Sequence, residues 1–158
     1  MGNCACEEQG KYVYGNGDYF IGTLKSKIPF GKGVLYYKNG DIKYEGDFVK
    51  GKMQGLGKYY FSDRDYYIGQ FKDDMRNGGG KIFDKDGNIK FEGEYINNHM
   101  NGIGIFYSEN GYYITQFVDN KMVGKGKLYY NNGTLIGEFY LVNDKLVNAA
   151  TLIPFPPN

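Results

Sequence analysis

Short segments in which apolar and polar residues alternate recur along the chain, separated by turns rich in glycine and asparagine. In one such segment, Tyr44, Gly46 and Phe48 alternate with the acidic residues Glu45 and Asp47. Alternation with a period of two residues is typical of a β-strand that buries one face. The pattern therefore predicts many short strands and almost no helix.

The predicted strands belong to an internal repeat of 22 to 24 residues. Each repeat contains the phrase aromatic–x–Gly–x–aromatic, followed nine residues later by a Gly–x–Gly. The first glycine falls at Gly22, Gly46, Gly69, Gly93 and Gly137, and Thr115 replaces it in the fifth repeat. The second motif falls at Gly31/Gly33, Gly55/Gly57, Gly78/Gly80, Gly102/Gly104 and Gly124/Gly126. We count five full repeats with a half repeat at each end, spanning residues 10–153.

This repeat closely resembles the MORN repeat. The resemblance implies an all-β fold, a single-layer antiparallel β-hairpin solenoid of about twelve strands that forms a curved and grooved sheet. Residues 1–9 would precede it as a flexible tail, and residues 154–158 would follow as a proline-rich tail. Leu146, Asn148 and Ala150 stand where a last Gly–x–Gly would fall. Terminal repeats are atypical because they close the stack, so we interpret this departure as a C-terminal cap.

Pairing residues 44–48 with residues 55–61 as a hairpin assigns a role to the glycines. Tyr44 and Phe48 would share the inner face with both Gly55 and Gly57, while the acidic residues would share the outer face with Lys58. Side chains on the concave side of a curved sheet crowd one another, and glycine removes them. We therefore expect the glycines to line a groove flanked by aromatic residues.

The inner-face aromatic residues allow two interpretations: a core that stacks repeat on repeat, or a groove that receives apolar residues of a partner. The candidate groove residues are Tyr44, Phe48, Tyr59, Tyr67, Phe71, Phe91, Tyr95, Phe106, Tyr113 and Phe117. A further aromatic column, predicted to be partly exposed on the outer face, is an alternative interface. Its members are Tyr36, Tyr60, Phe83, Tyr107 and Tyr129.

Charge and composition limit the classes of function. The net charge of +1 does not favour a nucleic-acid partner. The N-terminal third is mildly basic, which leaves direct binding of anionic phospholipid as an alternative function. The candidate contacts are Lys25, Lys27, Lys32, Lys50 and Lys52. We find no nucleophile–base pair, no phosphate-binding loop and no zinc-ligand spacing around the single His99, so we expect neither an enzyme nor a metal or other cofactor.

The first six residues, Met-Gly-Asn-Cys-Ala-Cys, form the second informative segment. Gly2 resembles an N-myristoylation acceptor, although Cys6 stands where serine or threonine is usual. Cys4 and Cys6 are placed as palmitoylation acceptors are in dually acylated proteins. One acyl chain binds a membrane only marginally, whereas two give stable anchoring. We therefore expect a lipid-anchored protein at the cytosolic face of a membrane, either the plasma membrane or a membrane associated with the cytoskeleton.

The resemblance also implies a class of function. MORN arrays work as scaffolds: some dimerise, some associate with phosphoinositides, and one compact member holds a myosin-tail helix in its groove. The hypothesis from the sequence is a non-catalytic, membrane-tethered adaptor that binds a peptide or helix of a cytoskeletal motor or signalling protein, with a homodimer possible.

Overall fold

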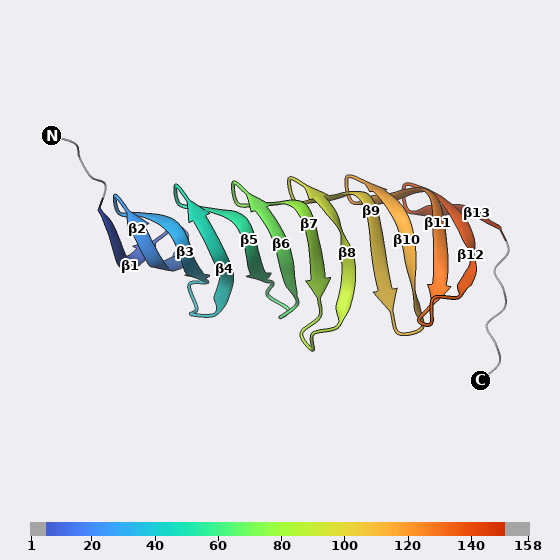
Figure 1. The fold of residues 1–158 in the computed structure, drawn as a ribbon, viewed down its shortest axis with the longest axis horizontal. Helices are drawn as coiled ribbons and strands as arrows, with labels where there is room; N and C mark the ends of the chain where they lie inside the picture. Colours follow the sequence, from blue (N-terminus) through green and yellow to red (C-terminus); the bar gives the residue numbers. More distant parts are fainter. Residues whose placement is uncertain (1–5, 151–158) are drawn as a thin grey trace. The chain divides into compact units, whose positions relative to one another are not determined.

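The computed structural model describes residues 6–150, and all the regular secondary structure there is β-strand. The strands are β1 (Glu7–Val13), β2 (Tyr19–Lys25), β3 (Ile28–Tyr36), β4 (Ile42–Val49), β5 (Lys52–Tyr60), β6 (Tyr66–Lys72), β7 (Met75–Phe83), β8 (Ile89–Ile96), β9 (His99–Ser108), β10 (Gly111–Val118), β11 (Lys121–Tyr130), β12 (Leu135–Val142) and β13 (Lys145–Ala150) (Figure 1). Their order in the sheet is their order in the chain. The predicted antiparallel hairpin architecture is confirmed.

Two compact units divide the described chain within β7. The first unit ends at Gly78 and contains β1–β6 with the start of β7. The second unit begins at Gly79 and contains the rest of β7 with β8–β13. Each unit is described below by itself.

Two kinds of turn connect the strands. The first kind is a two-residue turn in which both residues have positive φ, as at Asn143 (47°) and Asp144 (64°). Positive φ at both positions defines a type I′ turn, which matches the twist of the flanking strands. These short turns are Ser26–Lys27, Lys50–Gly51, Asp73–Asp74, Asn97–Asn98, Asp119–Asn120 and Asn143–Asp144. Because they all follow even-numbered strands, the short turns of each unit lie on one margin of its sheet.

The opposite margin carries longer loops, except between β9 and β10, where only Glu109 and Asn110 separate the strands. In the loop after β1, the Tyr14 amide donates to the Asp18 carbonyl at 2.8 Å, and Gly17 N donates to Tyr14 O at 2.9 Å. The same pair of bonds closes the loops at residues 37–41, 61–65, 84–88 and 130–134. We call the two sides the short-turn margin and the long-loop margin.

The two glycines of each Gly–x–Gly have different roles, which corrects the sequence-based assignment. Gly46 pairs with Gly57, but the next residue, Asp47, pairs with Gln54, so the strand carries two extra residues at this point. Gly55 lies within this bulge with φ of +68°, and a Cβ there would point at Asp47, 3.4 Å from its Oδ2 atom. The first glycine therefore supplies backbone conformation, since an L-residue rarely adopts this φ. Only the second glycine belongs to the inner face.

The N-terminal boundary also differs from the prediction. β1 begins at Glu7 rather than after residue 9, because Glu7 and Gln9 pair with Lys25 and Thr23 of β2. Gln9 also donates a side-chain hydrogen bond to Thr23 Oγ1 at 2.9 Å. Glu7 therefore lies at the short-turn margin, beside the β2–β3 turn.

Candidate binding surface

The first aromatic residue of three repeats, Phe20, Tyr44 or Phe91, lies over a pair of glycines. In the second unit, a Cβ on Gly93 or Gly104 would come within 2.6 Å of the Phe91 ring, closer than real Cβ contacts allow. In the first unit, the Tyr44 ring covers Gly46 and Gly57 in the same way, and its hydroxyl donates to Asp47 O and Gln54 O at 3.3 Å. These three rings and the Tyr67 ring, which occupies the same repeat position, are 0 to 2% exposed. Glycine is thus needed because the ring occupies the space of a side chain.

A second column of side chains fills the space between these rings. The Tyr44 ring makes edge contacts with Phe48 at 5.3 Å and with Phe71 at 5.0 Å between centroids. Phe48 and Phe71 are 1% and 4% exposed. Such edge-to-face contacts add to the stabilisation from burial itself. Seven of the ten predicted groove residues are therefore core: Tyr44, Phe48, Tyr67, Phe71, Phe91, Tyr95 and Phe117.

The other three predicted groove residues, Tyr59, Phe106 and Tyr113, are half-buried. In the first unit, Tyr59 lies 5.4 Å from Phe61 between ring centroids. In the second unit, Phe106 and Tyr113 form a parallel stack with 5.3 Å between centroids and 7° between planes. These three rings are the accessible part of the predicted groove.

Tyr14 crosses the inner face of the first unit. It belongs to the long-loop margin, yet its hydroxyl donates to the carbonyl of Gly51, in a short turn, at 3.0 Å. A single tyrosine side chain thus connects the long-loop margin to the short-turn margin, so the sheet of this unit is strongly curved. Burial, with Asp74 and Tyr12 nearby, raises the pKa of Tyr14 to about 12. Tyr14 braces this unit as a neutral phenol.

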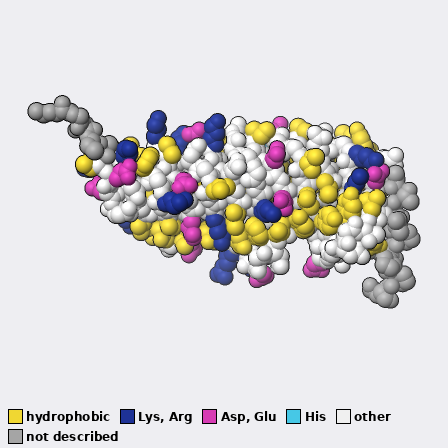
Figure 2. Space-filling model, viewed as in Figure 1, with side chains coloured by type: hydrophobic (Ala, Val, Ile, Leu, Met, Phe, Trp, Pro, Cys, Tyr) yellow, Lys and Arg dark blue, Asp and Glu magenta, His cyan; other side chains and the backbone are white. Residues whose placement is uncertain are grey.

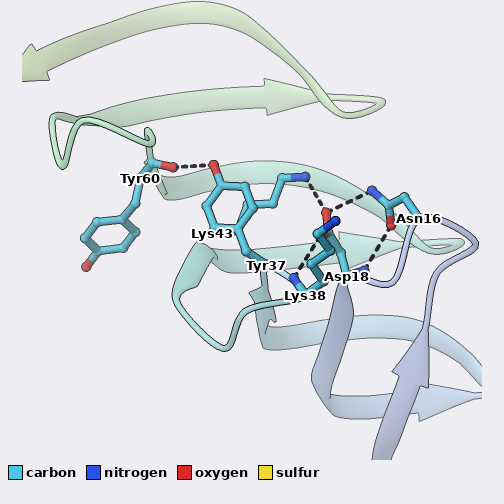
Figure 3. Close-up of polar contacts among 6 residues, drawn as sticks. All are labelled: Asn16, Asp18, Tyr37, Lys38, Lys43 and Tyr60. Carbon is cyan, nitrogen blue, oxygen red and sulfur yellow. Dashed lines mark hydrogen bonds and ion pairs between the residues drawn. The ribbon is translucent and has the colours of Figure 1, made fainter.

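Asp18 forms the most buried polar cluster of the first unit, where it is 6% exposed (Figure 3). Its carboxylate accepts from Lys43 Nζ at 2.6 Å, from Asn16 Nδ2 at 3.0 Å and from Lys38 N at 3.1 Å. Burial alone would raise the pKa of Asp18, but these donors and the charge of Lys43 hold the pKa below its ordinary value. Since its oxygens already accept three hydrogen bonds, the carboxylate holds two long loops together and is not placed for acid–base chemistry.

Thr115 interrupts the ring-over-glycine arrangement in the second unit. Thr115 stands where the preceding repeat has Gly93, which lies under the Phe91 ring, and the neighbouring Gly126 is covered by the Phe139 ring. Thr115 is 2% exposed, and its Oγ1 atom has no hydrogen-bond partner in the described part of the chain. The sequence shows Thr115 as a departure from the repeat, but the pattern alone does not indicate that Tyr113 is half-buried.

The outer-face aromatic column is half-buried in both units. In the first unit, Tyr36 stacks on Tyr19 with 4.9 Å between centroids and 11° between planes. Lys58 Nζ lies over Tyr60 at 4.6 Å and over Tyr66 at 4.0 Å. Stacking and cation–π contacts therefore shield part of each of these ring surfaces from solvent. This agrees with the expectation that the column is partly exposed.

Comparison with known families settles the class of the fold. The model of the MORN repeat matches residues 6–19, 20–42, 44–66, 67–89, 91–111 and 113–135, which together make up most of the chain. The chain belongs to the MORN-repeat family. No curated protein matches it significantly. MORN repeats are in general a non-catalytic module that mediates interactions with proteins or membranes.

The lysines predicted as phospholipid contacts are all exposed on the first MORN repeats. Three of the five form ion pairs: Lys25 with Glu7 at 3.7 Å, Lys32 with Asp47 at 3.0 Å and Lys52 with Asp73 at 3.6 Å. Lys27 and Lys50 lie in adjacent short turns. The structure therefore brings four of these lysines, all except Lys32, to the short-turn margin.

Some predictions fall outside what the structure describes. Gly2 and Cys4 precede the described residues, whereas Cys6 is exposed at their start. Within residues 6–150, no helix is long and apolar enough to span a membrane. In the same range, no three His, Cys, Asp or Glu side chains are grouped to hold a metal ion.

Proposed function

We propose that this MORN protein is a non-catalytic adaptor that binds a segment of a partner protein on its inner face. The observation that carries the proposal is the Phe106–Tyr113 stack. Its Tyr113 ring is half-buried, whereas the rings at the same position of four other repeats are core. Accessible aromatic side chains beside a packed floor are typical of binding hot spots. The open inner face accepts an extended or helical peptide whose apolar residues contact these rings.

Site-specific photo-crosslinking tests this proposal. A photoreactive phenylalanine analogue at position 106 should crosslink a partner segment in cells, because the ring there is accessible and near the expected peptide. The same analogue at Ile103, which is 69% exposed on the neighbouring outer face, is the matched control. Crosslinking from Ile103 but not from position 106 would move the partner to the outer face and contradict the proposal.

We further propose that acyl chains on Gly2, Cys4 and Cys6 hold the adaptor at the cytosolic face of a membrane. The supporting observation is the start of β1 at the short-turn margin, where Glu7 pairs with Lys25. Metabolic labelling with an alkyne-tagged myristate should label the natural protein and not Gly2→Ala. Replacing Cys4 and Cys6 by serine should leave weak, exchanging attachment, since one chain binds marginally. An intact Met1 and unmodified thiols in native material would contradict this part.

Direct binding of anionic phospholipid is a second candidate function, favoured by the adjacent short turns of the first unit. The Gly51 amide donates to the Pro29 carbonyl at 2.9 Å, so the turns carrying Lys27 and Lys50 lie side by side. Figure 2 shows Lys and Arg side chains projecting from the edge of the first strands. Ile28 and Val49, next to these turns, are 46% and 42% exposed. Cations beside exposed aliphatic side chains suit a lipid surface.

Full-length protein made without acylation distinguishes this candidate from lipid anchoring. If the lysines suffice, the protein should bind phosphatidylcholine vesicles containing phosphatidylserine, and Lys27→Glu with Lys50→Glu should abolish binding. Absence of binding by the natural, unacylated chain would leave acyl chains as the membrane contact. Because three of the five lysines are already ion-paired, the adaptor remains the first proposal.

A further inference from the structure

The fifth repeat differs from the others at one inner-face position, and the difference changes which ring surface reaches solvent. In the repeat before it, the Phe91 and Phe117 rings both pack against Gly104. A Cβ on this glycine would lie 2.6 Å from Phe91 and 2.9 Å from Phe117. In the fifth repeat, the glycine two residues after the aromatic residue is Thr115. Tyr113 is half-buried and stacks on Phe106. Thr115 and the greater exposure of the ring therefore occur in the same repeat.

We infer that Thr115 opens a subsite at the Phe106–Tyr113 stack that takes one uncharged, apolar side chain from the bound protein segment. This inference rests on the proposed adaptor function and locates it in the second unit. The accessibility of the Tyr113 ring is a property of the chain without a partner, so it can be tested separately.

The lining of the subsite determines the chemistry of its occupant. Among the described residues of β9–β12, the strand pairing places uncharged side chains around the two rings. These neighbours are Gly104, Thr115, Gly126, Leu128 and Phe139. A charged side chain brought here would lose water without gaining an ion partner, which is unfavourable. An aliphatic or methionine side chain gains contact with the ring edges and loses no hydrogen bond.

The hydroxyl of Thr115 supports a role beyond folding. A buried hydroxyl without a hydrogen bond lowers stability, and Thr115 Oγ1 has no partner among the described residues. Four other repeats place glycine at this position and bury the ring. The fifth repeat therefore keeps a residue that is unfavourable for packing at the point where the ring becomes accessible.

Tyrosine nitration by tetranitromethane, mapped by mass spectrometry, tests the accessibility of the Tyr113 ring without any ligand. Tyr113 should react in the natural protein, whereas Tyr44 and Tyr67, both 0% exposed, serve as protected internal controls. Thr115→Gly should slow nitration of Tyr113 severalfold, because the ring can then lie over the glycine. Thr115→Val keeps the branched side chain, so the rate should not change. Equal nitration of Tyr113 in the natural protein and Thr115→Gly would overturn the inference.

A peptide library displayed on phage supplies the binding probe. Peptides enriched on the full-length chain should carry an apolar residue whose replacement by aspartate weakens binding at least tenfold. Thr115→Gly and Tyr113→Ala should weaken the same peptides at least tenfold, whereas Thr115→Val should bind them as the natural chain does. Peptides that crosslink to position 106 but ignore Thr115→Gly would overturn the subsite and leave the adaptor proposal standing. Failure of any peptide to crosslink at position 106 would overturn both.

Discussion

In the first unit, the Tyr44 ring lies over Gly46 and Gly57 and is fully buried; in the second unit, Tyr113 occupies the same repeat position and is half-buried. The first unit also carries the Tyr14 brace and the buried Asp18–Lys43 pair. The comparison shows that an aromatic residue in this repeat is not core or surface by its own identity. The residue two positions later differs between the two, since glycine follows Tyr44 and Thr115 follows Tyr113.

The largest effect is expected when the first unit receives threonine at the position that Thr115 occupies in the second unit. Gly46→Thr would place a Cβ within the space of the Tyr44 ring and 2.9 Å from Gly57 Cα. We expect a loss of about 3 kcal/mol in the free energy of unfolding, because overpacking displaces a buried ring. Urea denaturation measures the change.

Gly79→Thr is the matched control for this variant. A Cβ on Gly79 would meet no atom within 4 Å, and its φ lies outside the left-handed region. The free energy of unfolding should change by less than about 0.5 kcal/mol, as is usual for surface positions. Equal losses for Gly46→Thr and Gly79→Thr would show that the ring seat is not the cause.

The buried ion pair is the next difference between the units. Asp18→Asn should cost about 2 kcal/mol, because it removes a charge-assisted hydrogen bond and leaves Lys43 Nζ without its carboxylate. The folded state lowers the pKa of Asp18, so its contribution is present above the ordinary pKa of aspartate. The contribution is lost as pH falls through the lowered pKa.

Urea denaturation at several pH values measures this effect as the difference between the natural protein and Asp18→Asn. Glu138→Gln in the second unit is the comparison, since Glu138 accepts at 2.7 Å from Lys125, whose side chain is 63% exposed. It should produce no measurable change, because solvent screens exposed pairs. A difference for Asp18→Asn that persists in strong acid would contradict the assignment.

The Tyr14 brace should have a smaller effect. Tyr14→Phe removes only the hydroxyl that donates to Gly51 O, and about 1 kcal/mol should be lost. The pKa of Tyr14 is raised to about 12, so its contribution is complete below pH 10, the ordinary value. The contribution should disappear as pH rises from there through about 12.

Unfolding measured up to alkaline pH tests the brace. Tyr140→Phe in the second unit is the control, because Tyr140 is 48% exposed. A cost for Tyr14→Phe that is unchanged above pH 12 would mean that the hydroxyl bond does not cause it.

Much of the fold follows from the sequence because its signals are local. Alternation and Asn–Gly turns predict the strands, and the expected crowding at Gly57 agrees with the ring that covers it. The sequence could not divide the aromatic residues between core and surface. Tyr44 and Tyr113 have the same parity, and the replacement of glycine by Thr115 does not by itself show how the ring turns. Asp18 also escaped prediction, since aspartate is common in turns and its partner Lys43 is 25 residues away. The proposed acylation remains a prediction, as Gly2 and Cys4 lie outside the described residues.

The smallest predicted effect concerns a feature that both units share at the short-turn margin. Asp74 Oδ1 accepts from Met53 N at 2.8 Å in the first unit, and Asn120 Oδ1 accepts from Met100 N at 2.7 Å in the second. The Lys50–Gly51 turn lacks this bond: Pro29 has no N–H to donate, and Gly51, which lies opposite it, has no side chain to accept. Donor and acceptor are thus both missing at the same turn, which indicates that the side-chain acceptor in the other turns is there to bind the backbone amide.

Asp74→Gly and Asn120→Gly should therefore cost about 0.5 to 1 kcal/mol each, the value of one partly exposed hydrogen bond. Glycine adopts the positive φ of these turns, so the change removes the acceptor without straining the backbone. Amide hydrogen exchange should become faster at Met53 in the first variant and at Met100 in the second. Asp119→Gly, at the first position of the same turn as Asn120, keeps the acceptor and should leave Met100 unchanged. Equal effects in the two units would place their difference on the inner face alone, whereas a loss in only one unit would show that the margins differ as well.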